Sequence, residues 1–502
     1  MNPTTSAAPP VPCRRPALLL LLTALALTGC TVGPDYVRPA VDAPASYKEQ
    51  GPWKTAQPGN IDDRQDWWKS YGDSTLDQLM DQANAANLTV QVAMAQYRQA
   101  RAEDQAARSS FWPQLGLSAG PSRARTNTGG TDGGTKLANA YAIGLDASWE
   151  PDLWGEVRRS VEASTATAQA SAAQLAAARL SIQAELAQDY LQLRVTDQQK
   201  ALYARTLAAY TRSLALTRSQ YEAGVTLRSD VALADAQLKT TQAQSIDLDA
   251  QRNQLEHAIA ILIGKPPAEF SLPPADGWRA SLPQTPAGVP SQLLERRPDI
   301  ANAERLAAAA NANIGVAQAA YYPSLTLSAG GGFSAPGGGL AQWFSVPNRV
   351  WALGASLAET LFDGGLRDAH TDAARAAYDA AVAQYKQTVL GGFQEVEDNL
   401  STLRVLGDEN TAQDQAVDAS RLAERLALSQ YRAGTTTYLT VVTVQAQTLS
   451  NERTSSELLG RQLVASVALV KAVGGGWKAS QLDGEAAAAQ TEQAAADGKR
   501  AD

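Results

Sequence analysis

The sequence predicts an α+β membrane protein with an internal duplication, in which membrane-spanning strands continue into very long coiled-coil helices. Three observations predict this fold. Matching segments recur at one fixed spacing, short segments alternate apolar with small or polar residues, and two long stretches contain no proline. The chain has 502 residues and a formal net charge of −8, which argues against a nucleic-acid partner.

Residues 1–29 are predicted to be a lipoprotein signal peptide. Two arginines precede an apolar run at 17–27 that is too short to remain as a membrane-spanning helix. The run ends in the sequence LTGC, which resembles a lipobox, so we expect Cys30 to be acylated and to become the new N-terminus. Thr31 stands where an aspartate would favour inner-membrane retention, so we expect outer-membrane sorting. The alternative is an ordinary signal peptide with an incidental cysteine.

The rest of the chain is predicted to be a tandem duplication with a period of 210 residues. The sequence FWPQLGLSAG at 111–120 matches YYPSLTLSAG at 321–330, and SQYEAG at 219–224 matches SQYRAG at 429–434. Both matches are offset by 210 residues, which makes coincidence unlikely as an explanation. A looser match pairs LWG at 153–155 with LFDG at 361–364.

Each repeat has the same predicted order of elements. A helical stretch runs to an aromatic-proline pair, two strands with a Gly-rich loop follow, and a very long helix then leads through an Ala-Gly turn into a second helix. The first helical stretches are expected at 75–111 and 298–321, and the very long helices at about 155–221 and 366–431. The predicted domains are a signal peptide (1–29), an N-terminal segment (30–74), a first repeat (75–264), a connection with seven prolines (265–290), a second repeat (291–475) and a disordered tail (476–502).

The strand-like segments have the pattern of a membrane barrel wall. Alternate residues form an apolar face, and the residues between them are small or polar. The apolar sets are Leu115, Leu117 and Ala119; Tyr141, Ile143, Leu145, Ala147 and Trp149; Leu325, Leu327 and Ala329; and Trp351, Leu353, Ala355 and Leu357. A half-buried hairpin of a soluble protein would show the same alternation.

Two repeats supply four membrane strands, which is too few to close a barrel. An open sheet edge cannot be left in hydrocarbon, and closed bacterial barrels need about eight strands or more. The chain must therefore oligomerise through its barrel, and this reasoning leaves a dimer, a trimer or a larger assembly open. In the long helices, Leu175, Ile182, Leu186 and Leu193 form the narrow apolar stripe of a coiled-coil seam.

The sequence contains no pattern that indicates an enzyme, a metal site or a cofactor. Its two histidines, His257 and His370, have no Cys or His partner at metal-ligand spacing. The Gly-rich segment 129–136 lacks the Gly-Lys-Ser/Thr ending of a phosphate-binding loop. We interpret 129–136 and 330–339 as exposed loops that join strands.

The ordered set of features resembles the TolC-like outer-membrane efflux factors. The lipobox, the segment LERRPDI at 294–300 and the Tyr-x-Ala-Gly turns are similar to the NodT-type lipoprotein branch. The resemblance implies a homotrimer that shares a twelve-stranded β-barrel, four strands from each chain, continued by an α-helical periplasmic tunnel with an equatorial belt. It also implies a lipid anchor in the outer membrane, a periplasmic adaptor (membrane fusion) protein and an inner-membrane pump of the RND type.

The function that the resemblance implies is passive conduction of small molecules, such as drugs, toxic compounds or metabolites, from the pump to the exterior. One alternative is a conduit for polypeptide secretion. Another is a lipid-anchored periplasmic coiled-coil spacer without a pore, against which the alternating strands argue.

The resemblance also assigns roles to the two Ala-Gly turns. These turns, with Tyr221, Gly224, Tyr431 and Gly434, would contact the adaptor; in the simplest interpretation they only end two helices.

Only some of the gate residues that the resemblance implies are present in this sequence. Asp230 and Tyr431 occupy the places of a family pair that bonds neighbouring helices in the closed state, and Leu439 matches a constriction ring. Where relatives carry an acidic ring, this chain has Thr440 or Thr443, so the resemblance does not carry the acidic ring over to these positions and leaves its existence open.

Overall fold

A computed structural model describes residues 31–49, 66–127, 135–275, 277–283, 296–336 and 344–479. The chain forms two compact units. The strand unit contains the described residues up to Pro39 together with Gln99–Ala168 and Arg305–Ala383, and the helical unit contains the remainder. Four helices, α3, α4, α7 and α8, have residues in both units.

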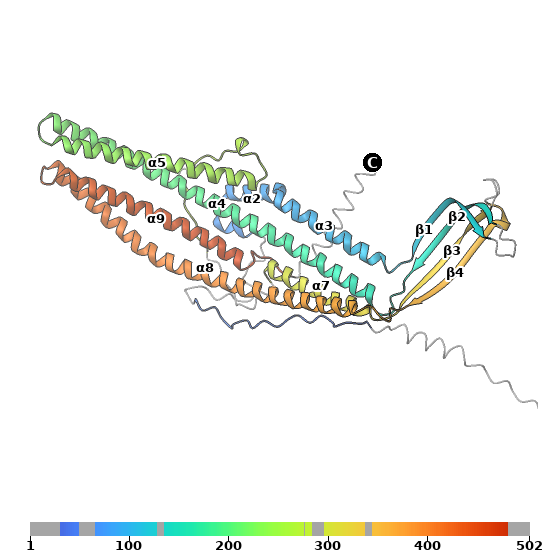
Figure 1. The fold of residues 1–502 in the computed structure, drawn as a ribbon. Helices are drawn as coiled ribbons and strands as arrows, with labels where there is room; N and C mark the ends of the chain where they lie inside the picture. Colours follow the sequence, from blue (N-terminus) through green and yellow to red (C-terminus); the bar gives the residue numbers. More distant parts are fainter. Residues whose placement is uncertain are drawn as a thin grey trace, which may run out of the picture. The chain divides into compact units, whose positions relative to one another are not determined.

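The helix boundaries confirm the internal duplication. Helices α7, α8 and α9 begin and end 210 residues after α3, α4 and α5, respectively. The elements, shown in Figure 1, are η1 (Trp67–Tyr71), α2 (Ser74–Ala86), α3 (Leu88–Ser109), β1 (Gln114–Asn127), β2 (Thr135–Trp149), α4 (Glu156–Glu222), α5 (Arg228–Leu262), η2 (Pro267–Glu269), α7 (Pro298–Ala319), β3 (Ser324–Pro336), η5 (Val346–Asn348), β4 (Arg349–Ala358), α8 (Leu366–Arg432) and α9 (Tyr438–Ala472).

The helix predicted over 75–111 is in fact two helices, because the chain breaks at Asn87. Asn87 has extended backbone angles, and its side-chain oxygen accepts a hydrogen bond from the Val90 amide at 3.0 Å, which caps the start of α3. Its side-chain amide donates to the Leu262 carbonyl at 2.8 Å. In the second repeat α7 corresponds to α3, Arg297 is the residue equivalent to Asn87 and also lies outside a helix, and residues 284–295 lie outside the described part.

In the strand unit, the strands form one antiparallel sheet in the order β1-β2-β3-β4 (Figure 1). The register places Leu117 opposite Leu145, and Ala329 opposite Leu353, so the apolar sets predicted from the alternation share one face. Most of this face is uncovered: Leu117 is 71% exposed and Leu353 is 75% exposed. Among the described residues, no strand pairs with the outer side of β1 or β4.

The opposite face of the sheet is lined by small and polar side chains. Ser118 donates a hydrogen bond to Asp146 at 2.9 Å. The expectation of a loop over 330–339 is wrong for its first part, because residues 330–336 belong to β3. A Cβ atom on Gly332 would lie 2.2 Å from the Ile143 carbonyl oxygen, so the close strand contact requires glycine there. The loop expected over 129–136 is likewise wrong for residues 135 and 136, which belong to β2, and residues 128–134 and 337–343 lie outside the described part.

The segment after residue 30 packs tightly against the start of α4 and against α7, all within the strand unit. The Val32 amide donates to the Trp154 carbonyl at 3.0 Å, and Arg159 donates to the carbonyls of Val32 and Gly33. A Cβ on Gly33 would lie 2.4 Å from the Cα of Gly315, so the two backbones touch. The N-terminal segment is thus held against residues 154–159, which follow the end of β2 by a few residues.

In the helical unit, α4 and α5 form one antiparallel hairpin and α8 and α9 form the other (Figure 1). The stripe predicted from the sequence is confirmed, since Leu175, Ile182, Leu186 and Leu193 are all buried in the largest core cluster. That cluster also includes residues from η1, α2 and α9. No helix among the described residues is both long enough and apolar enough to cross a bilayer.

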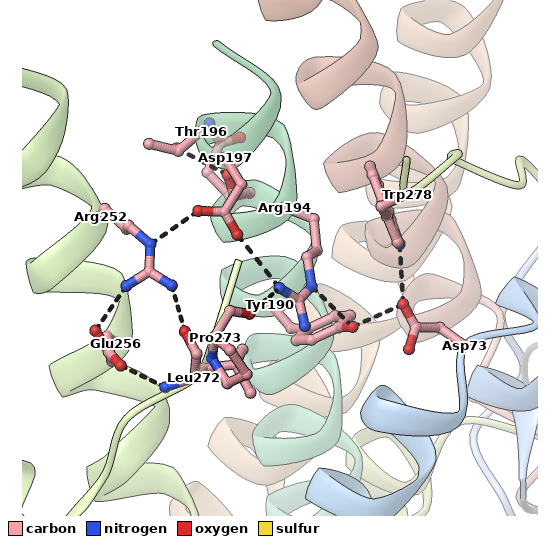
Figure 2. Close-up of polar contacts among 11 residues, drawn as sticks. Asp73, Tyr190, Arg194, Thr196, Asp197, Arg252, Glu256, Leu272, Pro273 and Trp278 are labelled. Carbon is pink, nitrogen blue, oxygen red and sulfur yellow. Dashed lines mark hydrogen bonds and ion pairs between the residues drawn. The ribbon is translucent and has the colours of Figure 1, made fainter. Parts of the chain in front are cut away.

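A buried ionic network joins α4 and α5 to the connection between the repeats (Figure 2). Arg252 on α5 donates to Asp197 on α4 and to Glu256, each at 2.8 Å. Arg252 also donates to the Leu272 carbonyl, and the Leu272 amide donates to Glu256. Arg194 bonds Asp197 at 3.3 Å and the Pro273 carbonyl at 2.9 Å. The backbone of the connection is therefore held from both helices.

Tyr190 extends this network to the N-terminal part of the unit. Its hydroxyl donates to Asp73 at 2.7 Å and accepts from Arg194 at 3.0 Å, while the Trp278 indole also donates to Asp73 (Figure 2). Burial alone would raise the pKa of Asp73, but these bonds and two backbone amides hold it below its usual value. At the places of Asp197 and Arg252 the second repeat has Gly407 and Gln462.

We expect Arg252→Ala to loosen the connection selectively. The change leaves Asp197 and Glu256 buried without their cation, which typically costs about 3–5 kcal/mol. In hydrogen-exchange mass spectrometry, the peptide that contains Leu272 should exchange roughly a hundredfold faster, or more. Arg205→Ala, an exposed change on α4, is the matched control and should not alter this exchange. Equal protection in both variants would contradict a stabilising role for the network.

Candidate functional site

The two helical turns that the sequence singles out have the same backbone. The Gly224 amide donates to the Tyr221 carbonyl at 2.9 Å, and the Gly434 amide donates to the Tyr431 carbonyl at 3.0 Å. In each turn the next amide, that of Val225 or Thr435, bonds the carbonyl five residues earlier. The glycine φ angles are +73° and +72°. These are Schellman caps, which require the left-handed conformation that glycine adopts without strain.

The tyrosines that begin the two turns have different environments. Tyr221 is 45% exposed, whereas Tyr431 is only 7% exposed. The difference arises at the first residue of the following helix: Tyr438 packs against Tyr431 with ring centroids 5.2 Å apart, and the equivalent residue in the first repeat is Arg228. The buried Tyr431 hydroxyl has no hydrogen-bond partner among the described residues.

Asp230 lies in the first turn of α5, where the helix dipole favours an acidic side chain. It accepts a hydrogen bond from the Thr226 hydroxyl, four residues earlier. Within the described part of a single chain, no bond joins Asp230 to Tyr431, the residue with which it was predicted to pair. The described part of one chain therefore does not bring Asp230 and Tyr431 into contact, and their pairing stays a prediction.

Leu439 is exposed on the first turn of α9, with 57% of its surface accessible. Thr443, one turn later, donates its hydroxyl to the Leu439 carbonyl at 2.9 Å, and the Thr440 hydroxyl lies 3.3 Å from that of Thr437. The exposed residues Leu439, Thr440 and Thr443 at this end of α9 therefore carry no charge.

Tyr438 also contributes to this region, although it was not among the site residues predicted from the sequence. Its hydroxyl lies 3.2 Å from that of Ser213 on α4, so it links the second hairpin to the first. Burial raises the pKa of Tyr438. It belongs to a core cluster that contains residues of all four hairpin helices: Tyr210, Leu214, Ala234, Leu238, Ala427, Tyr431, Tyr438 and Val441. The 210-residue offset could have identified it, because an aromatic residue there replaces Arg228.

The other residues that the sequence singles out are the two histidines, which lie in the described part, and Cys30, which does not. Cys30 lies outside the described residues, as does the tail from residue 480. His257 and His370 are both exposed on helices. In the part of the chain that the structure describes, no group of three His, Cys, Asp or Glu side chains could hold a metal ion.

Comparisons with known proteins agree with the sequence resemblance. Residues 79–265 and 289–475 both match the model of the outer membrane efflux protein family. The pyoverdine export outer membrane protein OpmQ of Pseudomonas aeruginosa is 30% identical over 92% of this chain and 98% of its own. The outer membrane protein OprJ of the same organism is 32% identical over 92% of this chain and 97% of its own.

Solved structures agree as well. The structure of the outer-membrane channel OprN superposes with a TM-score of 0.83 and 34% identity, and covers 89% of this chain and all of that one. The two repeats, the four-stranded sheet and the paired long hairpins are therefore the fold of these outer-membrane channels. The chain belongs to the outer membrane efflux protein family.

Proposed function

We propose that this chain is the outer-membrane channel component of a tripartite efflux system and passively conducts small molecules from a periplasmic adaptor and inner-membrane pump to the exterior. The observation that carries the proposal is the sheet, which has one exposed apolar face, one face of small and polar residues, and two edges that pair with no strand in the described part of the chain. A barrel wall needs these properties: lipid outside, water inside, and pairing between neighbours.

The assembly that fits this sheet is a homotrimer. A four-stranded sheet does not close alone, and three copies supply twelve strands, enough for a lumen. Small residues on the polar face, such as Gly116 and Gly144, leave that lumen open. The relative OpmQ is named as a pyoverdine export protein. For this chain we propose only the broader class of small molecules as the exported cargo. An adaptor protein and a pump of the RND type are the proposed partners, and the turns at Gly224 and Gly434 are the proposed adaptor contacts.

We further propose that the ends of the hairpins form the gate between neighbouring chains. The Tyr431 hydroxyl is buried and has no partner among the described residues, so a carboxylate of a neighbouring chain is a suitable acceptor. Asp230 supplies that carboxylate. Leu439, exposed and apolar, would form a constriction ring when three copies come together. No acidic ring is proposed, because Thr440 and Thr443 are neutral.

The lipid anchor completes the proposal. The residues after Cys30 are fixed beside the start of α4, close in sequence to the end of β2. An acylated Cys30 would therefore be held near one boundary of the membrane, where its chains can enter the bilayer. The protein would be anchored in the outer membrane and would extend into the periplasm.

The purified protein should be a trimer in detergent and should form ion-conducting pores in planar bilayers. Single-channel recording tests the pore, and mass determination of the detergent-corrected complex tests the trimer. A monodisperse monomer that keeps its strand content by circular dichroism would contradict the shared barrel.

Asp230→Ala and Tyr431→Phe should each raise the conductance of the resting channel. A hydrogen bond to a carboxylate contributes roughly 1.5–3 kcal/mol. Threefold symmetry repeats it, so several kcal/mol favour the closed state. Adding Leu439→Ala to either variant should raise conductance further. Tyr221→Phe is the matched control, because this exposed tyrosine occupies the same place in the first turn. Wild-type conductance in both single variants, with trimers intact, would show that these are ordinary helix-end contacts.

The mature protein should begin at Cys30 and carry acyl chains on both the thiol and the α-amine. Intact-mass spectrometry of protein purified from membranes measures both features. A Cys30→Ser variant should lack the added mass. An unmodified Cys30, or a mature chain that starts elsewhere, would rule out the anchor.

A further inference from the structure

Three arginines lie on the lipid-facing side of the proposed barrel. By the pairing register, Arg123 and Arg125 on β1 share the face of Leu117, and Arg349 on β4 shares the face of Leu353. All three side chains are exposed. None of them has a hydrogen bond or ion pair with the described residues. The four strands contain one carboxylate, Asp146, and it lies on the opposite face.

These arginines share one height along the strands. We count residues from the end of each strand that is next to a helix in the sequence. Arg123 is nine residues from Gln114, where β1 begins, and Arg349 is nine residues from Ala358, where β4 ends. Arg125 is two residues farther than Arg123. Nine residues at 3.3 Å span about 30 Å, and a tilt of about 40° reduces this to roughly 23 Å along the membrane normal. That height is close to the typical apolar band of about 25 Å.

Aromatic residues mark the same level. Tyr141 is eight residues from Trp149, and Phe333 is nine residues from Ser324. Aromatic side chains typically ring a barrel at the boundary between hydrocarbon and headgroups. The three arginines therefore lie at the outer boundary, where the headgroups of the outer leaflet begin.

The three arginines all lie on the two edge strands, β1 and β4. In the proposed barrel, β4 of one chain would pair with β1 of the next, and residues at similar heights would lie close together across the seam. Arg349 of one copy would then lie beside Arg123 and Arg125 of its neighbour. Each seam gains a cluster of three guanidinium groups with no carboxylate on its face, directly above an apolar surface.

We propose that each seam between subunits binds a phosphorylated glycolipid of the outer leaflet. Its phosphates would bond the cluster of Arg123, Arg125 and Arg349, and its acyl chains would lie on the apolar face below. Arginine suits this role because its planar guanidinium bonds phosphate at two points. This inference rests on the proposed outer-membrane barrel.

The test measures binding of bisphosphorylated lipid A to the purified full-length trimer in detergent by native mass spectrometry. The variant combines Arg123→Gln, Arg125→Gln and Arg349→Gln. The matched control removes three exposed charges from the helices, through Arg205→Gln, Arg212→Gln and Lys386→Gln. Binding should weaken about tenfold or more in the first variant and should not change in the control. Dephosphorylated lipid A should bind wild type as weakly as lipid A binds the first variant.

The outcomes separate this inference from the proposed function. Equal binding by both variants, or equal weakening in both, would overturn the glycolipid site. Displacement of lipid A by inorganic phosphate, or equal binding of phosphatidylglycerol, would overturn the choice of a glycolipid. Conductance is recorded on the same preparations: a conducting wild type with no lipid difference overturns only this inference, whereas a wild type that never conducts overturns the proposed function.

Discussion

The unpaired edges of the four-stranded sheet are the constraint on which the rest of the structure depends. Each edge strand has a row of N–H and C=O groups that pair with no other strand among the described residues of its chain. In hydrocarbon such groups cost several kcal/mol each, so a lipid-exposed sheet must find further strands. The duplication supplies two hairpins, β1-β2 and β3-β4, and pairs them through β2 and β3. The outermost strands remain available for neighbouring chains, so backbone chemistry accounts for the proposed oligomerisation through the sheet edges.

The two long helical hairpins show how a duplicated backbone can acquire different surfaces. Their lengths, turns and glycine conformations agree in both repeats, because a helix end needs the same cap whatever its role. The side chains differ at the start of the second helix of each hairpin, where one repeat has Arg228 and the other has Tyr438. The aromatic side chain buries Tyr431 and leaves its hydroxyl without a partner in the described chain. Asymmetry between equivalent hairpins thus gives them different parts in the proposed gate, with Asp230 from the first hairpin and Tyr431 and Leu439 from the second.

The buried ionic network holds the first hairpin to the connection between the repeats. Arg252 and Arg194 neutralise Asp197 and Glu256, and together they hold the connection between the repeats at Leu272 and Pro273. A buried ion pair adds little stability compared with apolar packing, but removing one partner destabilises the fold strongly because the other charge stays buried without a counter-ion. The network therefore fixes the arrangement of α4, α5 and the connection. In the second repeat Gly407 replaces Asp197, and Gln462 replaces Arg252, so this clamp has no counterpart there.

Matches between distant segments of the sequence revealed the 210-residue duplication. The sequence by itself also determined the features that depend on local patterns: the alternating faces of the strands, the seam of Leu186 and Leu193, and the glycine caps at Gly224 and Gly434. Each follows from backbone geometry that a few neighbouring residues impose. Only the tertiary structure decided the break at Asn87, the inclusion of Gly330–Gly332 in β3, and the packing of Tyr438 on Tyr431. It also decided the network around Arg252. These depend on contacts between residues far apart in the chain, such as Asn87 with Leu262 and Gly332 with Ile143, which a local pattern does not encode.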